Sequence, residues 1–154
     1  MMKIKTLFFV LFALCLSAKA QDTTVSDEDL KKYAIAMDSI EGMKGMLLET
    51  ISEMVKGNEN VSAARYNELS KIIDDQGKLV EAKATEEEIT FVKAVAGRKA
   101  EETAKINATF QSLAKDYVGA KAFNTVKKAL NEDPAVKEKY NDLLEELKKS
   151  GEEN

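Results

Sequence analysis

The chain has 154 residues, of which 32% are charged and 6% aromatic, and it contains no His, no Trp, one Cys and one Pro. This length fits one domain of ordinary size, and the composition favours a helical, water-exposed fold. Without His the chain lacks the side chain most used for acid–base catalysis near neutral pH and the commonest metal ligand, which disfavours catalytic triads and zinc sites.

The first twenty residues have the pattern of a secretion signal. Lys3 and Lys5 precede an apolar run from Leu7 to Leu16, and Ser17-Ala18-Lys19-Ala20 ends in the small-x-small pattern of a signal-peptidase site. The run is too short to span a bilayer. We therefore predict a signal peptide at residues 1–20, cleaved after Ala20, and a periplasmic or secreted protein. An uncleaved N-terminal anchor is the alternative.

Removal of the signal changes both the charge and the cysteine content. The signal carries three Lys and no acid, so 20 basic and 27 acidic residues remain, a formal net charge of −7. Such a chain repels nucleic-acid phosphates and anionic bilayers overall, so we expect no nucleic-acid partner and no stable membrane insertion after cleavage. Cys15 leaves with the signal, so stability has to come from core packing without disulfides.

Two long helices are expected, one in each half of the remaining chain. Ser26 and Thr85 each precede three acidic residues, which is the pattern of a helix N-terminus. From Leu30 to Met54, and again from Ile89 to Leu113, apolar residues recur in steps of three and four with polar interruptions midway. This spacing predicts helices that pack in coiled-coil fashion. Gly57 fits the end of the first helix.

A shorter helix is expected after each long one. Val61, before the cap residue Ser62, is expected to pack on Tyr66, and Val118, before Gly119, is expected to pack on Phe123. Both pairs have the spacing of a hydrophobic staple.

Polar segments with turn residues end both short helices. Asp74-Asp75-Gln76-Gly77 breaks the first, and Asn131-Glu132-Asp133-Pro134 breaks the second. Asp133 and Pro134 then fit the cap and first residue of a last helix. Its expected inward residues are Val136, Tyr140, Leu143 and Leu147.

The two halves are similar in sequence. Residues 61–83 match residues 118–140 at a register of 57, and residues 26–30 match residues 85–89 at a register of 59. The two registers imply an insertion or deletion of two residues between the blocks. We therefore predict two internal repeats, at about 26–83 and 85–147.

The predicted fold is all-α, with two hairpins of a long and a short helix that form an elongated four- or five-helix bundle. The predicted domain covers residues 26–149, between disordered tails at 21–25 and 150–154. No stretch alternates apolar and polar residues as a strand would.

Two parts of this sequence carry a resemblance to a known family. The segment Val25-Ser26-Asp27-Glu28-Asp29-Leu30-Lys31-Lys32-Tyr33-Ala34 is similar to the start of the bacterial family filed as domain of unknown function 4168. Phe123-Asn124, Ala129 and Asp133-Pro134-Ala135-Val136 resemble the closing elements of that family. The resemblance spans about residues 25–147. It implies an exported helical protein, and it implies no activity and no catalytic residues.

Four methionines are the first candidates for chemistry. They are Met37, Met43, Met46 and Met54. The pair Met43 and Met46 lies one helical turn apart, a spacing at which soft sulfur ligands suit Cu(I). Met37 and Met54 fall on the apolar stripe, and Met commonly fills irregular cores, so we favour packing. An adaptable surface for unfolded clients is the other alternative.

Acidic clusters occur at Asp27-Glu28-Asp29, Glu86-Glu87-Glu88 and Glu145-Glu146. Such clusters are able to bind hard cations or to supply a pair of carboxylates for hydrolysis. The first two lie in expected first turns of helices, where acids stabilise the helix dipole. We therefore predict a structural role and name no catalytic, cofactor-binding or metal-binding residues.

Two asparagines and three glycines need an explanation. Asn67 and Asn124 stand beside the expected staples at equivalent points of the repeats, where they fix helix register by bonding to the backbone or, as the alternative, line a pocket. Gly42, Gly45 and Gly97 lie inside expected long helices. Each costs about 1 kcal/mol relative to Ala, which predicts a close helix approach or a kink.

These observations favour a non-enzymatic, exported helical protein that binds a partner. The leading hypothesis is a binding or chaperone-like envelope module whose inter-helix groove takes apolar segments of proteins. The alternative is an assembly protein that self-associates through the seam from Leu30 to Met54. An enzyme that uses only carboxylates, Lys or Tyr has the least support. No cofactor is expected.

Overall fold

The computed structural model describes residues 25–152. The predicted signal peptide, Cys15 and the cleavage site after Ala20 lie outside the described residues. Within residues 25–152 all regular structure is helical, which confirms the all-α prediction.

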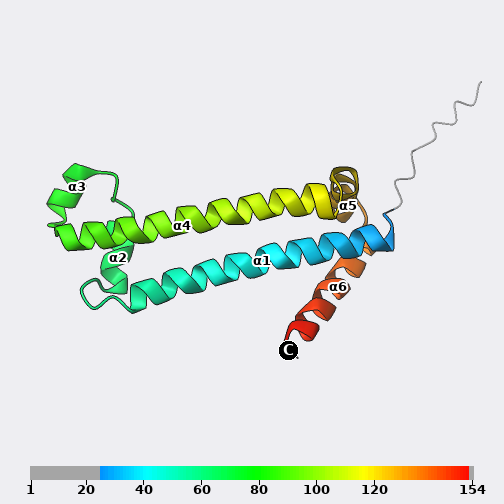
Figure 1. Ribbon diagram of the computed structural model, residues 1–154, viewed down its shortest axis with the longest axis horizontal. Coiled ribbons are helices and arrows are strands. Elements are labelled where there is room, and N and C mark those ends of the chain that lie inside the picture. Colours follow the sequence, from blue (N-terminus) through cyan, green and yellow to red (C-terminus); the bar gives the residue numbers. More distant parts are fainter. Residues whose placement is uncertain (1–24, 153–154) are drawn as a thin grey trace, which may run out of the picture.

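Two long antiparallel helices form the body of the molecule, α1 (Asp27–Lys56) and α4 (Glu86–Ser112) (Figure 1). Both begin as predicted, because the Ser26 hydroxyl accepts from the Asp29 N–H and the Thr85 hydroxyl accepts from the Glu88 N–H. In α4 the Glu88 carboxylate also accepts from the Thr85 N–H, which completes a capping box. Gly57 is the C-cap of α1.

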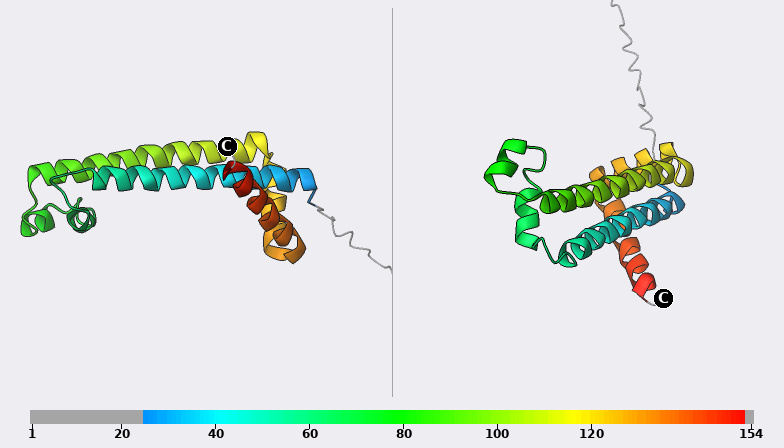
Figure 2. Two further views of the ribbon diagram at one scale, coloured as in Figure 1. Left: turned by 90° about the horizontal axis from the view of Figure 1, so that it is seen from below. Right: turned by 60° about the vertical axis from the view of Figure 1, so that its left-hand side comes forward.

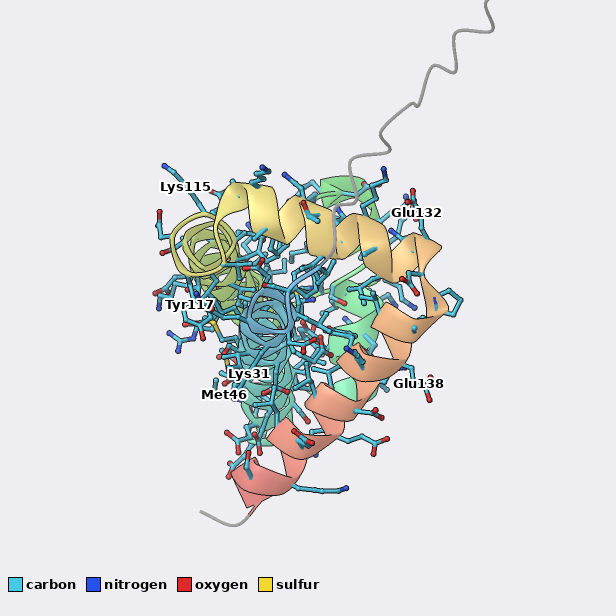
Figure 3. The ribbon with its side chains drawn as sticks, turned by 90° about the vertical axis from the view of Figure 1, so that its right-hand side faces the viewer. Lys31, Met46, Lys115, Tyr117, Glu132 and Glu138 are labelled. Carbon is cyan, nitrogen blue, oxygen red and sulfur yellow. The ribbon has the colours of Figure 1, made fainter. Side chains whose placement is uncertain are left out.

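Short helices close the two ends of this hairpin. At one end are α2 (Ala63–Leu69) and α3 (Gln76–Glu81). At the other end are α5 (Ala120–Glu132) and α6 (Pro134–Glu152). Figures 2 and 3 show both sets of short helices on the same side of α1 and α4, so the opposite side of the hairpin is open along its length.

The two-residue difference between the repeats lies where each long helix joins the next helix. In the first half, a connection without regular helix joins α1 to α2, and α2 begins at Ala63, 36 positions after α1 begins at Asp27. The second half uses one π-helical turn, η1 (Leu113–Tyr117), and α5 begins 34 positions after α4 begins at Glu86. The wider turn includes a bond from the Val118 N–H to the Leu113 carbonyl at 2.9 Å.

The core is divided into two clusters, one at each end. The buried residues of the first are Leu30, Tyr33, Ala36, Val118, Phe123 and Val126, and those of the second are Leu69, Leu79 and Val92. Many members are equivalent in the repeats: Leu69 with Val126, Tyr66 with Phe123, Leu79 with Val136, and Val92 with Tyr33. Each cluster contains residues from both halves of the chain, so neither half has a core of its own.

The predicted apolar stripes are right for most of α1 and partly wrong for α4. In α1, Leu30, Tyr33 and Ile40 are buried. In α4, Val95 is fully buried instead of the predicted Ala96, which is exposed. The core-facing side of α4 therefore carries Val92, Val95 and Ile106, and it does not pass through Ala96.

Three boundaries differ from the prediction. The first short helix ends at Leu69, and a turn then places Ile72 and Ile73 against the second cluster, so α3 is an additional helix capped by Asp75. The predicted tail at 150–154 is wrong for residues 150–152, which continue α6. The predicted tail at 21–25 is wrong for Val25, which packs against the first cluster beside Leu30, as a hydrophobic staple does.

Candidate functional site

The middle of the hairpin carries large apolar side chains that nothing in the described chain covers. Leu48 is 72% exposed and Met46 is 61% exposed, whereas Leu47 between them is half-buried. Successive residues of an α-helix are about 100° apart, so Met46 and Leu48 lie on opposite sides of α1. Figure 3 shows Met46 and Tyr117 on the side away from α5 and α6.

Leu48 lies on the side of the short helices, as its spacing from Leu30 shows. The two residues are five full turns apart on α1, so they share one face of the helix. Leu30 is only 2% exposed because α5 and α6 pack there, and at the far end Val55 is buried near α2. On this face of α1, Leu30 and Val55 are therefore buried near the two ends, and Leu48 between them is exposed.

Helix α4 is differently built over the same length. Its outer surface has ion pairs between Arg98 and Glu102 at 3.2 Å and between Lys105 and Glu101 at 2.9 Å. Lys105 lowers the pKa of the Glu101 carboxyl and its own pKa is raised in turn. Such pairs support an exposed helix without tertiary contacts. The exposed large apolar side chains at mid-length, Met46 and Leu48, thus both belong to α1.

The four methionines do not gather at one place. Met37 packs against the first cluster, and Met43 and Met54 are half-buried, in agreement with a packing role. Met46 alone is widely exposed. A Cu(I) site formed by Met43 and Met46 would therefore combine one half-buried thioether and one exposed thioether.

The glycines of the long helices have no close neighbour within the described chain. A Cβ atom added at Gly42, Gly45 or Gly97 would meet nothing within 4 Å. The prediction that close helix approach compensates for these glycines is therefore wrong for contacts within the chain. Gly45 lies one turn before Leu48, so it leaves open backbone beside the exposed leucine.

Two acidic residues at the start of α1 form ion pairs with lysines. Asp27 pairs with Lys139 at 3.2 Å, and Glu28 pairs with Lys32 at 2.7 Å, which raises the pKa of Lys32. Among the described residues, no group of three or more acidic, His or Cys side chains has a metal-binding arrangement.

Glu88 belongs to a network that the sequence reading missed. Arg65 donates from Nε to Glu88 Oε1 at 2.8 Å and from Nη2 to Glu88 Oε2 at 3.0 Å, and it also donates to the Ala82 carbonyl. Such a forked pair is strong and directional. Arg65 and the Thr85 N–H hold the pKa of the Glu88 carboxyl below its usual range. The network ties α2, the α3–α4 connection and α4 together.

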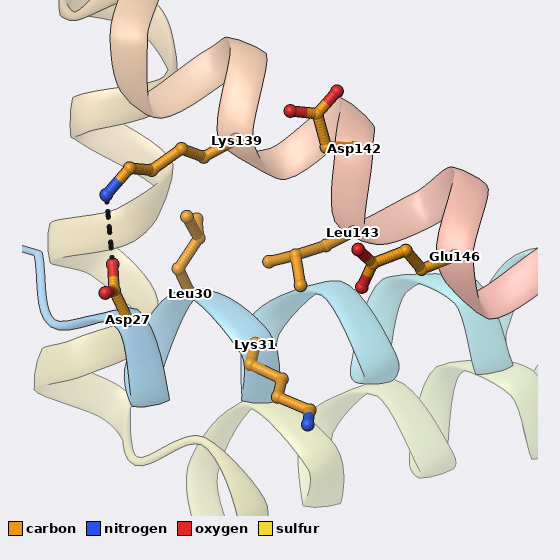
Figure 4. Close-up of a pocket in the computed structure, with 7 residues that line it drawn as sticks. All are labelled: Asp27, Leu30, Lys31, Lys139, Asp142, Leu143 and Glu146. Carbon is orange, nitrogen blue, oxygen red and sulfur yellow. Dashed lines mark hydrogen bonds and ion pairs between the residues drawn. The ribbon is translucent and has the colours of Figure 1, made fainter.

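A groove of about 320 Å³ lies between the start of α1 and α6 (Figure 4). Leu30 and Leu143 are its apolar residues, and the Asp27–Lys139 pair closes one end. Glu146, the predicted acidic residue of α6, lines the groove, and Lys31 extends away from α6. The groove combines paired and unpaired charges of both signs and favours no single ligand charge.

Asn67 and Asn124 are both exposed, and neither side chain bonds to another described residue. The prediction that they fix helix register is therefore wrong. The alternative holds for Asn124, which lines a pocket of about 400 Å³ between the end of α4 and the start of α5. The sequence reading could identify this residue only by its repeat position.

The chain matches no family model, no curated protein and no solved structure. Membership in the family of domain of unknown function 4168 stays a prediction. Over the described part of the chain, every helix is too short or too polar to cross a membrane.

Proposed function

We propose that this protein is a non-enzymatic, exported binding module of the chaperone-like kind. Its central hairpin takes apolar segments of partner proteins on the face of α1 that carries Leu48. The single observation that supports this most is the 72% exposure of Leu48 on a face that is covered at both ends by short helices. Contact with a partner would remove the apolar surface of Leu48 from water, which favours binding.

The surroundings of Leu48 favour segments with basic residues beside their apolar ones. Glu49, next to Leu48, is exposed and forms no ion pair with a described residue, whereas Lys44 on the Leu48 face pairs with Glu41 at 3.8 Å. Free carboxylates beside an apolar surface attract a positively charged segment and repel other acidic chains. Open backbone at Gly45 allows a bound segment to approach α1 closely.

The test uses residues 21–154 of the chain. It measures whether this protein suppresses the aggregation of the insulin B chain that follows reduction of the insulin disulfides. We expect the protein to suppress light scattering at stoichiometric amounts, and Leu48→Gln to reduce this effect severalfold. The matched control is Val80→Gln, because Val80 is 69% exposed but lies on α3, outside the central face. Equal loss in both variants, or no suppression at stoichiometric excess, contradicts the proposal.

Self-association is the second candidate, and a different observation favours it. Leu30, Tyr33 and Ile40 of the predicted seam are buried inside the chain, but Met46 of the same seam segment is exposed on the open side of the hairpin. A second hairpin laid on that side would bury Met46 and Tyr117. Sedimentation equilibrium would then show a dimer that Met46→Gln weakens and Leu48→Gln does not. A monomer mass at all concentrations excludes this candidate.

A further inference from the structure

The pocket beside Asn124 has an aromatic floor. Phe110 of α4 is 36% exposed, although its ring lies 5.6 Å edge-on from the ring of buried Phe123. Ala114 and Ala120 complete the apolar part of the pocket. The pocket has a volume of about 400 Å³ and is open to solvent on one side, so a small molecule can enter it without a conformational change.

The rim of the pocket is polar, and its polar groups have no protein partners. Gln111, Lys115 and Asn124 line it, and none of the three side chains bonds to or pairs with a described residue. Figure 3 shows Lys115 extending from this end of the hairpin. No carboxylate lines the pocket, although acidic residues outnumber basic ones in the chain. The rim therefore offers one ammonium group and two amides to a ligand.

The backbone at the pocket is a π-helical turn, η1, which includes Ala114 and Lys115. Single π-helical turns are rare in proteins and are frequently found at functional sites. Here it places Lys115 and Ala114 beside the first turn of α5. The other end of the hairpin joins α1 to α2 without such a turn.

We propose that this pocket binds a small carboxylic acid with an aromatic or branched apolar body. The body lies against Phe110 and Phe123, and the carboxylate accepts from the Lys115 ammonium and from the amide groups of Gln111 and Asn124. An ammonium group and amide donors without competing acids bind a carboxylate with charge-assisted hydrogen bonds. The groove between α1 and α6 does not fit such a ligand, because Asp27, Asp142 and Glu146 line it.

This site is separate from the central face of α1 and does not depend on the proposed function. Leu48 does not line the pocket, so Leu48→Gln should leave ligand binding unchanged. A protein that fails to suppress aggregation can still bind the acid.

The test is a titration of isotope-labelled protein, residues 21–154, with 3-phenylpropionate, followed by amide chemical shifts. The neutral 3-phenylpropionamide is the ligand control. We expect saturable shifts at residues 110–124 and about tenfold tighter binding of the acid than of the amide, because the charged hydrogen bonds are lost. A Gly-Gly-Phe peptide with a free carboxyl end, compared with its amide, tests whether a peptide terminus supplies the same chemistry.

Two variants at exposed positions assign the binding to the rim. Lys115→Gln should weaken binding of the acid about tenfold, and Asn124→Ala should weaken it by a smaller factor. Lys121→Gln is the matched control, because Lys121 is exposed and unpaired on α5 but does not line the pocket. Absence of a saturable shift, equal binding of acid and amide, or equal effects of Lys115→Gln and Lys121→Gln overturns the proposal.

Discussion

At the end formed by α2 and α3, the forked pair between Arg65 and Glu88 joins the helices, whereas the equivalent positions at the other end are Ala122 and Asp29. That other end is closed by aromatic rings. Tyr33 lies 4.9 Å from Phe123 and 5.8 Å from Tyr140, measured between ring centroids. The repeat preserves where the apolar residues stand, but the contact that joins each short helix to the hairpin has a different chemical basis at each end.

The lengths of the short helices explain this difference between the two ends. Helices α2 and α3 have 7 and 6 residues, and α5 and α6 have 13 and 19. Short helices bury little apolar surface, so a directional ion pair stabilises their position. The longer helices bury apolar and aromatic area, and their ion pair between Asp27 and Lys139 is a single, exposed contact.

The largest expected effect comes from removal of the central ring at the aromatic end. Phe123→Ala should lower the free energy of unfolding by about 3–5 kcal/mol, because Phe123 is 8% exposed and contacts two rings. Tyr66→Ala, the equivalent change at the other end, should cost less, because Tyr66 is only half-buried and has one ring contact, with Phe91 at 6.3 Å. Urea unfolding followed by circular dichroism measures both. Equal costs would show that the ends do not differ in packing.

Glu88→Gln should be the next largest change. It removes the charge that faces Arg65, and we expect a loss of about 1–2 kcal/mol of unfolding free energy. Asp29→Asn is the matched control, since Asp29 is the repeat equivalent of Glu88 and forms no ion pair with a described residue. If urea unfolding shows the same loss for both, the ion pair does not stabilise the α2–α3 end.

The α2–α3 end should lose stability at low pH, and the α5–α6 end should lose stability at high pH. The pKa of Glu88 is lowered in the folded chain, so its contribution is complete above the unfolded value of about 4.3 and is lost as the pH falls through the folded value. Burial raises the pKa of Tyr33 and Tyr140, so their contribution is complete below about pH 10 and is lost at higher pH. Methyl NMR signals of Leu79 and Val126 report the two ends separately. If both signals change in the same pH range, the prediction of separate pH dependences is contradicted.

A smaller, stabilising effect is expected at Lys83, between α3 and α4. Lys83 has a φ of +51°, its N–H donates to the Val80 carbonyl, and the Ala84 N–H donates to the Leu79 carbonyl. This is a Schellman motif with Lys at the position that favours Gly. Lys83→Gly should therefore raise the unfolding free energy by about 1 kcal/mol. Ala82→Gly, at a neighbouring negative φ, should lower it instead.

The smallest effect concerns the uncovered middle of the hairpin. Gly45→Ala should stabilise the chain by about 0.5–1 kcal/mol, because a Cβ there meets no atom and Ala favours the helix. The same change at Gly119, where φ is +91°, should destabilise it. Thermal unfolding of both variants checks the sign. Destabilisation by Gly45→Ala would contradict the absence of a neighbour for a Cβ atom at this position.

Several features followed from the sequence because they depend on local chemistry. The side chains of Ser26, Thr85 and Asp133 accept hydrogen bonds from backbone N–H groups two or three residues further along the chain. Short spacings in the sequence were therefore enough to place three helix starts. The register of the repeat, with its two-residue difference, was visible because equivalent core positions keep their apolar character. The all-α class followed from the same periodicity.

The tertiary structure decided what depends on contacts distant in the sequence. The Arg65–Glu88 pair joins residues 23 positions apart, and no local pattern marks it. Leu30 and Leu48 have the same place on the face of α1, yet one is buried and the other exposed, because α5 and α6 fold back over only one of them. Helical spacing determines which side a residue faces. Only the packing of the other helices decides whether that side is covered, and here this leaves the middle of the hairpin open.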